Sequence, residues 1–367
     1  MKYFLIAGEA SGDTHAAALM VQIKQRDSQA QFVGLGGDQM AAAECRLYEH
    51  IRHMAFMGFA AVLANIGQVR RNFRITHEAL LHERPDVLIL VDYPSFNLRI
   101  AAFCRKHLPE TRIIYYIPPK VWAWKRRRVH RIARLCDEVL GIFPFEPDFY
   151  ARYGYRCTYV GNPTVEGINK SSIFNLQSSI PKSIALLPGS RFAEVSYCLP
   201  RLLEAARQFP DYRIVVCAAP GIDDAFYTPY LREGETLTRD TYTAVKQAKA
   251  AVVNSGTATL ETALLGTPQV AVYHVPFSWF YGRIRWAQPL FFSIRWFTLV
   301  NIILNKEVIR ELLATDFTIE NVTTELRRLL TDEAYTKEML ANYEHLHSLL
   351  GSSPAAATAA AIITSRQ

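Results

Sequence analysis

Short, continuous apolar runs recur along this chain, and each is followed by a polar turn and a stretch with helical spacing. Runs of this kind are typical of parallel strands that helices cover on both faces. Their alternation with helical stretches predicts βαβ units and therefore an α/β fold. The runs are YFLIAG, FVGLGG, DVLILVD, RIIYYIP and EVLGIFP, and then SIALLPGSR, YRIVVCAAPG, AAVVNSGTA and PQVAVYHVP.

The strand pattern stops at a polar join within residues 165–182 and then restarts. A chain of 367 residues is long enough for about two domains. We therefore expect two doubly wound, Rossmann-like domains, residues 1–168 and 169–334, that face an interdomain cleft. Residues 335–367 are expected to be C-terminal helices, and two alternatives stay open for their Ala-rich end: a helix, with a return to the N-terminal domain, or a frayed terminus.

Composition narrows the class of protein. Half of the residues are apolar, and the six cysteines form no C-x-x-C pair, which favours a reduced, cytosolic protein. The N-terminal apolar run reaches Glu9 too soon for a signal peptide. His345 and His347 would lie about 200° apart on a helix, which is poor geometry for chelation. We expect no metal and no other cofactor.

The net charge is +7, and basic residues concentrate between Arg99 and Arg134, with KRRR at 125–128. Such a segment forms a solvated face, contacts the phosphates of a ligand, or binds an anionic membrane surface. All three alternatives stay open, and a nucleic-acid partner is not expected.

The stretch VVNSGTATLETALLGTP, residues 252–268, begins as a buried strand and then changes to small residues. Ser255 or Thr257 is predicted to cap the helix that follows. The N–H groups and positive dipole at a helix start attract an anion, and small residues let a phosphate reach the backbone. Glu261, about one turn later, offers two oxygens to a ribose diol. A capped helix with a solvated glutamate is the alternative.

A second turn of the same kind occurs in LLPGSRFAEV, where Arg191 can reach the same diphosphate. Two such turns in one domain indicate a nucleoside diphosphate at the carboxyl ends of the strands. Neither turn is a P-loop, and GLGGDQM is not a G-x-G-x-x-G motif. ATP hydrolysis and a conventional dinucleotide site are therefore disfavoured.

Seven motifs follow one another along the chain: AGEASGD at 7–13, DYPSFN at 92–97, PPKVWAW at 118–124, FPFE at 143–146, LLPGSR at 186–191, SGTATLE at 255–261 and LVNIILNKEVIRELL at 299–313. In this order they resemble the lipid A disaccharide synthases, which are inverting glycosyltransferases of the two-Rossmann-domain (GT-B) architecture. The resemblance extends from about residue 6 to about residue 313.

The resemblance implies transfer of 2,3-diacylglucosamine from its UDP conjugate to 2,3-diacylglucosamine 1-phosphate, with inversion, to give the β-1,6-linked disaccharide 1-phosphate and UDP. It implies that residues 1–168 bind the acceptor and residues 169–334 the UDP-sugar. The implied UDP contacts are Arg191, Ser255, Gly256, Thr257, Glu261 and Asn301. The implied reaction side comprises Glu9, Ser11, Gly12, Asp13, Asp92 and Asn97.

Two positions depart from the family pattern, and two other functions compete with it. Asn162 stands where many members carry His, and Ala314 stands where Gln is usual. UDP-sugar 2-epimerases share the double-Rossmann layout, but they need neither the basic, aromatic WAWKRRR segment nor a lipid-facing surface. A non-enzymatic protein that binds a nucleotide sugar or lipid at the membrane surface is the other alternative.

Inversion by one displacement needs a base for the acceptor hydroxyl and groups that stabilise the departing UDP. We expect the helix after Ser255 and Arg191 to meet the second need. Asp92 is the predicted base, because it ends a strand and Tyr93-Pro94 turns the chain out of the sheet. A structural alternative is that Asp92 caps the next helix.

Three other residues are rival bases. Glu9 and Asp13 belong to the GEASGD turn, which resembles a cradle for groups of the acceptor. His15 lies in the first predicted helix, and an imidazole would match the required pKa better than a carboxylate does.

No run in the sequence reaches the ~20 apolar residues of a membrane span. The spacing of the apolar residues within 56–74 predicts an amphipathic helix. Such a helix either packs on its own sheet or lies in the membrane interface and admits acyl chains, and we favour the interface. The resemblance implies a cytoplasmic protein at the inner face of the inner membrane and leaves a homodimer open. The predicted apolar face comprises Phe59, Val62, Leu63, Ile66 and Phe73, with Asn65, Gln68 and Asn72 opposite.

Overall fold

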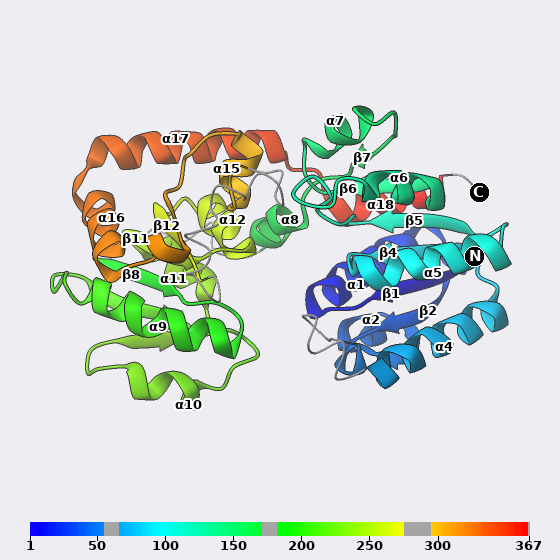
Figure 1. The fold of residues 1–367 in the computed structure, drawn as a ribbon, viewed down its shortest axis with the longest axis horizontal. Helices are drawn as coiled ribbons and strands as arrows, with labels where there is room; N and C mark the ends of the chain where they lie inside the picture. The colour runs from blue at the N-terminus through cyan, green and yellow to red at the C-terminus, as the bar shows by residue number, and fades with distance from the viewer. Residues whose placement is uncertain (55–65, 171–181, 275–294, 366–367) are drawn as a thin grey trace. The chain divides into compact units, whose positions relative to one another are not determined.

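The computed structural model describes residues 1–54, 66–170, 182–274 and 295–365 (Figure 1). The chain divides into two compact units, Met1–Pro163 with Ser352–Gln367, and Thr164–Gly351. The sequence placed the first boundary after residue 168 and grouped 335–367 together. The structure instead divides the C-terminal part at Gly351, so that one terminal helix belongs to each unit.

The first unit is built on a sheet whose strand order is β3-β2-β1-β4-β5-β6-β7. All of these strand pairs are parallel. From β1 the chain proceeds to β2 and β3 on one side and then crosses to β4 on the other, so the topological switch lies between β1 and β4. The strands are β1 (Lys2–Ala7), β2 (Gln31–Gly36), β3 (Cys45–His50), β4 (Val87–Val91), β5 (Arg112–Tyr116), β6 (Glu138–Gly141) and β7 (Thr158–Tyr159).

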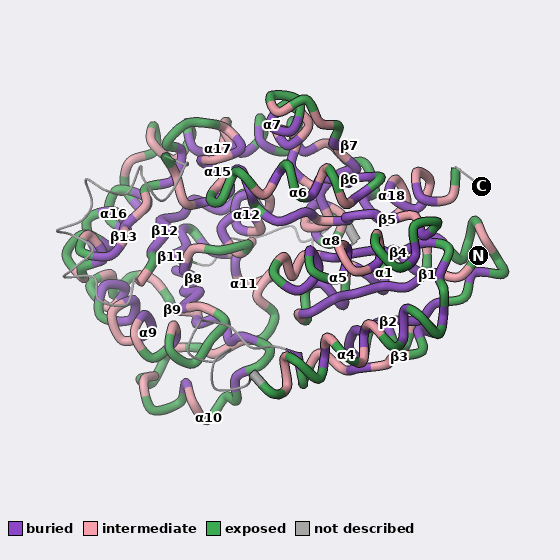
Figure 2. The backbone as a smooth tube through the Cα atoms, turned by 45° about the vertical axis from the view of Figure 1, so that its right-hand side comes forward, coloured by how far each residue is buried: buried purple, intermediate pink, exposed green. Residues whose placement is uncertain are grey.

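Helices cover this sheet, and the central strands are buried almost along their whole length (Figure 2). Burial of β4, whose sequence is VLILV, follows from its lack of polar side chains. The elements between the strands are α1 (Ala10–Arg26), α2 (Asp38–Ala42), η1 (Ile51–His53), α4 (Ile66–Glu83), α5 (Pro94–His107), α6 (Arg128–Leu135) and α7 (Glu146–Ala151).

The Ala-rich C-terminus forms helix α18 (Ala355–Thr364) and completes the first unit. Ala359, Ala360 and Ile363 are buried in the same hydrophobic cluster as β1 and α1. Arg112 donates from Nη1 to the carbonyl oxygen of Ile363 at 2.8 Å, which satisfies an acceptor in the last turn of α18. Of the two alternatives for this segment, the packed helix is the one adopted.

The second unit contains a parallel sheet of order β10-β9-β8-β11-β12-β13, with its switch point between β8 and β11. The two predicted doubly wound folds are therefore confirmed. The strands are β8 (Ser183–Leu187), β9 (Arg213–Cys217), β10 (Thr236–Thr238), β11 (Ala250–Asn254), β12 (Gln269–Tyr273) and β13 (Glu311–Leu313). The helices are α8 (Pro163–Lys170), α9 (Phe192–Ala206), α10 (Asp224–Tyr227), η3 (Thr228–Tyr230), α11 (Thr241–Gln247), α12 (Thr257–Leu264), α15 (Leu299–Leu304), η5 (Ala314–Asp316), α16 (Ile319–Thr331) and α17 (Glu333–Leu350).

Candidate active site

Two carboxylates flank the switch point of the first unit. Glu9 follows β1 and Asp92 follows β4, and these two strands pair side by side. A Cβ atom on Gly8 would lie 2.3 Å from the ring of Tyr93, so only glycine allows this close approach of the two turns. Burial, and next the charge of Glu9, raise the pKa of Tyr93. The structure thus brings two of the predicted acids to the same edge of the sheet.

The backbone fixes the position of Asp92. Asp92 and Tyr93 have φ angles of 44° and 47°, in the left-handed region that non-glycine residues rarely adopt. The N–H of Asp92 donates to the carbonyl of Ile117 at 3.2 Å, and its carbonyl accepts from Asn97 Nδ2 at 2.7 Å and Tyr115 Oη at 2.8 Å. These hydrogen bonds offset a strain of about 1–3 kcal/mol per left-handed residue.

The electrostatic surroundings of Asp92 suit a proton acceptor. Burial raises the pKa of its carboxyl, whereas the charge of Lys120 and the N–H of Tyr93 lower it. Desolvation in turn lowers the pKa of Lys120, against the attraction of Asp92 and Glu146. Helix α5 begins at Pro94 without a side-chain cap, so Asp92 does not take the capping role that was its alternative. A carboxylate with a raised pKa is a stronger general base.

Asp13, a predicted rival base, has a structural role in the first unit. Its Oδ1 accepts from the N–H groups of Gly37 at 2.7 Å and Met40 at 3.0 Å, and its Oδ2 accepts from Gln39 at 3.0 Å. The side chain is buried. The carboxylate therefore satisfies the first-turn N–H groups of α2, because these donors have no partner within the helix.

The other predicted reaction-side residues occupy different environments. Ser11 is exposed in the first turn of α1, where Glu9 is the N-cap residue and no side chain caps the helix. Gly12 is buried, and His15 is partly exposed further along the same helix. Asn97, a predicted substrate contact, is fully buried, and its Nδ2 donates to the carbonyls of Val91 and Asp92. It thereby holds the backbone of Asp92.

The predicted nucleotide residues gather at the switch point of the second unit. Arg191 lies in the turn after β8, and residues 255–257 lie in the turn after β11, which pairs with β8. Gly189 has a φ of 122°, and a Cβ atom there would be 2.7 Å from Asn254 Nδ2. Glycine is therefore needed where the two turns meet.

The start of α12 is open to an anion. Gly256 is its N-cap residue, and no side chain caps its first turn. The predicted caps Ser255 and Thr257 are therefore wrong, and Ser255 instead donates its N–H to the carbonyl of Val272 at 2.7 Å. The uncapped N–H groups and the positive end of the helix dipole are suited to a phosphate.

Two charged side chains lie close to these turns in the sequence, Arg191 in the turn after β8 and Glu261 in helix α12. Arg191 is 59% exposed and donates from Nη1 to Glu194 Oε1 at 2.9 Å. Glu261 accepts a hydrogen bond from the hydroxyl of Tyr242 at 3.2 Å. Burial raises the pKa of Glu261, and the bond from Tyr242 opposes this rise. A guanidinium and a carboxylate next to a helix start provide the groups predicted for a diphosphate and a ribose.

Asn301, a predicted contact of UDP, has a structural role in this unit. It is fully buried in α15. Its Nδ2 donates to the carbonyl of Ile309 at 2.8 Å and to Glu311 Oε1 at 2.9 Å, and its Oδ1 accepts from the N–H groups of Val308 and Ile309. These four bonds use the whole hydrogen-bonding capacity of the Asn301 side-chain amide. The bond to Glu311 joins α15 to β13.

Both positions that depart from the family pattern, Asn162 and Ala314, are buried. Asn162 is buried and donates from Nδ2 to the carbonyl of Ile142 at 3.0 Å. Ala314 is buried with a left-handed φ of 51°.

The predicted membrane-facing residues are only partly described. Phe59, Val62 and Leu63 lie outside the described residues, as does the side chain of Ile66, the first residue of α4. In the described part, Asn72 is buried and donates to the carbonyl of His53 at 2.8 Å. Phe73 stacks on Phe96 with 4.5 Å between ring centroids. The predicted orientation is therefore wrong at Asn72 and Phe73, because both residues pack on their own unit.

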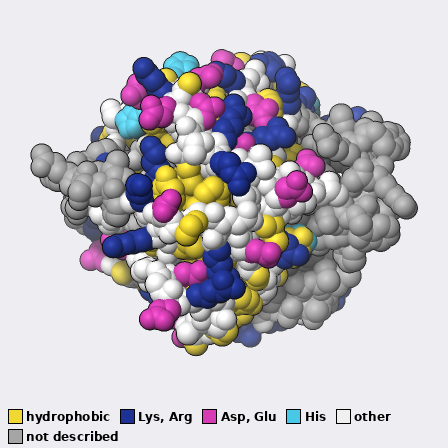
Figure 3. Space-filling model, turned by 90° about the vertical axis from the view of Figure 1, so that its left-hand side faces the viewer, with side chains coloured by type: hydrophobic (Ala, Val, Ile, Leu, Met, Phe, Trp, Pro, Cys, Tyr) yellow, Lys and Arg dark blue, Asp and Glu magenta, His cyan; other side chains and the backbone are white. Residues whose placement is uncertain are grey.

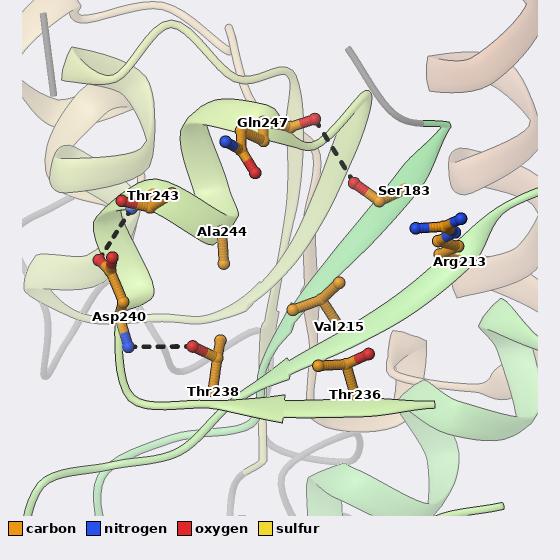
Figure 4. A pocket seen from close by; sticks show the side chains of 9 residues that line it. All are labelled: Ser183, Arg213, Val215, Thr236, Thr238, Asp240, Thr243, Ala244 and Gln247. Carbon is orange, nitrogen blue, oxygen red and sulfur yellow. Dashed lines mark hydrogen bonds between the residues drawn. The ribbon is translucent and has the colours of Figure 1, made fainter. Parts of the chain in front are cut away.

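A cavity of about 270 Å³ lies elsewhere in the second unit, between α11 and the strands β9 and β10 (Figure 4). The N–H of Asp240 donates to Thr238 Oγ1 at 3.1 Å, and Asp240 Oδ1 accepts from the N–H of Thr243 at 3.2 Å. These polar groups form the turn into α11. The lining includes none of the predicted site residues, so the cavity is separate from the switch point.

Two Rossmann-like units, each with charged groups next to its switch point, place this chain in the GT-B fold class. The fold is similar to a putative UDP-N-acetylglucosamine 2-epimerase from Listeria monocytogenes, with a TM-score of 0.64, 12% identity and coverage of 99% of this chain and 96% of that one. It is also similar to the glycosyltransferase of kitacinnamycin, with a TM-score of 0.63, 12% identity and coverage of 99% and 98%. At these identities the likeness shows the fold alone.

The sequence comparisons are more specific. The model of the lipid-A-disaccharide synthetase family matches residues 3–363. Lipid-A-disaccharide synthase of Myxococcus xanthus is 36% identical over 98% of this chain and 96% of its own length, and that of Geobacter sulfurreducens is 32% identical over 99% and 96%. The chain belongs to the lipid-A-disaccharide synthetase family and is a glycosyltransferase. The epimerase and non-enzymatic alternatives are thereby rejected.

Proposed function

We propose that this enzyme transfers 2,3-diacylglucosamine from its UDP conjugate to the 6-hydroxyl of 2,3-diacylglucosamine 1-phosphate, with inversion. One observation carries this proposal: each unit has polar groups at its topological switch point, with two carboxylates in one unit and an uncapped helix start in the other. A transferase that joins two sugars needs one site for each of them.

The donor is assigned to the second unit. Its diphosphate would accept hydrogen bonds from the first N–H groups of α12, and the exposed guanidinium of Arg191 would bind the same oxygens. The ribose diol would donate to the carboxylate of Glu261. A solved structure of this fold, UDP-GlcNAc 2-epimerase from Neisseria meningitidis, carries UDP-GlcNAc, with a TM-score of 0.58, 11% identity and coverage of 100% of this chain and 99% of that one.

The reaction is a single displacement. The Asp92 carboxylate takes the proton of the acceptor 6-hydroxyl while the oxygen attacks C1 of the donor sugar, and the bond from C1 to the UDP oxygen breaks. Charge then develops on the departing UDP, where the α12 dipole and Arg191 stabilise it. Attack on the face opposite the leaving group inverts C1. The base is thus assigned to the first unit and the donor to the second.

We propose a peripheral association with the inner face of the inner membrane from the cytoplasm. Trp124 is 48% exposed, and Lys125 Nζ lies 4.1 Å from the centre of its ring. The neighbouring Arg126 and Arg127 are exposed. An aromatic side chain with adjacent cations suits an anionic lipid surface. The face shown in Figure 3 instead mixes basic and acidic side chains.

One apolar stretch near the C-terminus is long enough to be considered as a membrane span. By length and hydropathy alone, Glu333–Thr364 could cross a membrane. This stretch consists of α17 and α18, which belong to different units, and buried alanines of α18 form part of the first core. Its apolar character is therefore explained by packing.

The function is tested by incubating the protein with UDP-2,3-diacylglucosamine, with and without the acceptor. We expect UDP and the disaccharide 1-phosphate to appear only when the acceptor is present. Release of UDP at the same rate without acceptor, and no disaccharide by mass spectrometry, would contradict the proposal.

A further inference from the structure

A tyrosine from a neighbouring helix contacts the carboxylate that is assigned to the ribose. Tyr242 lies in α11, and its hydroxyl donates to Oε1 of Glu261 in α12 at 3.2 Å. The ring of Tyr242 packs against the hydrophobic cluster that contains Val245 and Val253. Since the ring is held by this packing, the direction of the hydroxyl toward Glu261 is restricted.

Tyr242 and Glu261 influence each other's pKa. Burial, as the larger cause, and the charge of Glu261, as the second cause, raise the pKa of Tyr242 far above neutrality. The phenol therefore stays protonated and donates a hydrogen bond to Glu261. Burial raises the pKa of Glu261, and the bond from Tyr242 is the effect that lowers it. The tyrosine therefore favours the ionised form of the Glu261 carboxylate, whereas burial favours the protonated form.

We propose that Tyr242 is a positioning residue for the donor, which holds Oε1 of Glu261 so that the remaining acceptor capacity of the carboxylate faces the ribose diol. This inference rests on the proposed function, because it requires UDP at the start of α12. A glutamate side chain that is free to rotate loses conformational entropy when it binds a ligand, and a fixed partner removes part of that loss before binding.

The fold explains why α11 supplies this group. Helix α11 leads from β10 into β11, and α12 follows β11, so the two helices precede and follow one strand next to the switch point. Among the described residues, Tyr242 is the hydrogen-bond partner recorded for the Glu261 carboxylate. Loss of its hydroxyl would leave the ring packing intact and would remove only the contact with Glu261.

The test is Tyr242→Phe, with the binding of UDP and of 2′,3′-dideoxy-UDP measured by calorimetry. We expect UDP to bind about three- to tenfold more weakly, because one hydrogen bond to a carboxylate is lost. The dideoxy nucleotide lacks the diol, so its affinity should not change. The matched control is Tyr335→Phe, which removes a similar bond, from Tyr335 to Glu325 at 2.7 Å, between α17 and α16.

Two further measurements separate positioning from damage to the fold. In a Glu261→Gln background, Tyr242→Phe should cause little additional loss of UDP affinity, because the carboxylate it acts through is already absent. The pH below which UDP affinity falls should shift upward in Tyr242→Phe, since the pKa of Glu261 rises further. An equal loss for both nucleotides, or a further loss in the Glu261→Gln background, would overturn the inference.

The inference and the proposed function can fail separately. If the wild-type protein binds no UDP, the proposed donor site fails. If the wild type binds UDP and Glu261→Gln weakens that binding, while Tyr242→Phe binds as the wild type does, the inference about Tyr242 alone is overturned.

Discussion

Asp92 and Ile117 are joined by a backbone hydrogen bond of 3.2 Å, and both have left-handed φ angles, of 44° and 59°. The bond lies just beyond the last paired residues of β4 and β5, Val91 and Tyr116. It ties together the turns that carry the predicted base and Lys120. The position of Asp92 thus depends on its backbone, and a change of its side chain should leave the turn in place.

Asp92→Asn should lower turnover by about 10²–10⁴-fold, because the amide keeps the shape of the side chain and cannot accept the proton. UDP affinity should not change, since the donor is assigned to the other unit. Initial rates and calorimetry on the same preparation test both statements. His15→Gln is the comparison: if Asp92→Asn kept near-normal turnover and His15→Gln lost it, the catalytic role would move to His15.

Lys120→Met should shift the acid limb of the pH–rate profile to higher pH. The charge of Lys120 lowers the pKa of Asp92, so its removal raises that pKa. Because the reaction needs ionised Asp92, activity would then be lost earlier as the pH falls. At high pH, where Asp92 is ionised in both proteins, the rates should converge.

Lys125→Met is the control, because it changes an exposed lysine that stacks on Trp124 and should leave the acid limb in place. A limb that stays fixed or moves downward in Lys120→Met would refute the coupling.

Asp13→Ala should destabilise the first unit by ~2–4 kcal/mol, because three backbone N–H groups lose their acceptor. Urea unfolding followed by circular dichroism measures the loss. The neighbouring Thr14→Ala removes an exposed side-chain bond within α1 and should change the free energy of unfolding by less than about 0.5 kcal/mol. Equal stability of the two variants would show that Asp13 does not cap α2.

The sequence predicted the interior strands of both sheets and missed the edges. Among the described residues, the strands that contain no continuous apolar run are β3, β7, β10 and β13, which end the two sheets. β3 reads CRLYEH and is buried at only some positions. Continuous apolar runs form where neighbouring strands and helices cover a strand on all sides. An edge strand is not covered on all sides, so it does not need a continuous apolar run, and its sequence resembles that of a loop.

Residue type and strand ends were sufficient to place the predicted site residues in the fold. Glu9, Asp92 and Arg191 lie in the loops that follow strands next to a switch point, and Glu261 lies in α12, the helix after β11. Spacing does not reveal whether a polar side chain faces a ligand or the backbone, as Asp13 shows by bonding to N–H groups 24–27 residues away.

Two neighbours of the site had no recognisable signal in the sequence. Lys120 belongs to the PPKVWAW motif, but its proximity to Asp92 arises only when β4 pairs with β5. Tyr242 meets Glu261 only through the packing of α11 beside α12. Such contacts between side chains that are remote in sequence depend on tertiary structure and not on local pattern.

Arg191→Ala and Glu261→Ala should each weaken UDP binding by about 1.5–3 kcal/mol, since each removes a charged hydrogen-bond partner. Calorimetric titration with UDP measures the change. Arg310→Ala is a control, because Arg310 is an exposed arginine that immediately precedes β13, at the opposite end of the strands. Unaltered UDP affinity in both site variants would remove the nucleotide from this switch point.

Glu146 holds the loop after β6 and, through Trp122, the segment that carries Lys120. Its buried carboxylate accepts from the N–H groups of Ile142 at 2.8 Å and Phe143 at 3.0 Å and from Trp122 Nε1 at 3.2 Å. Burial raises its pKa to about 7, and these hydrogen bonds only partly oppose the rise. The group therefore changes its charge in the range where the enzyme is expected to work.

This raised pKa predicts how stability depends on pH. Between the ordinary pKa of about 4.5 and the folded pKa of about 7, the folded protein binds the Glu146 proton and the unfolded chain releases it. The contribution of Glu146 to stability is thus fully present below about pH 4.5 and is lost as the pH rises through about 7, a change of about 3 kcal/mol. Glu146→Gln cannot titrate, so its free energy of unfolding relative to the wild type should increase by roughly 2.5 kcal/mol from pH 5 to pH 8. In Glu83→Gln the same difference should stay constant over this range, because the hydrogen bonds of Glu83 lower its pKa to about 2. Urea unfolding at several pH values makes the comparison, and a difference for Glu146→Gln that does not change with pH would contradict the raised pKa.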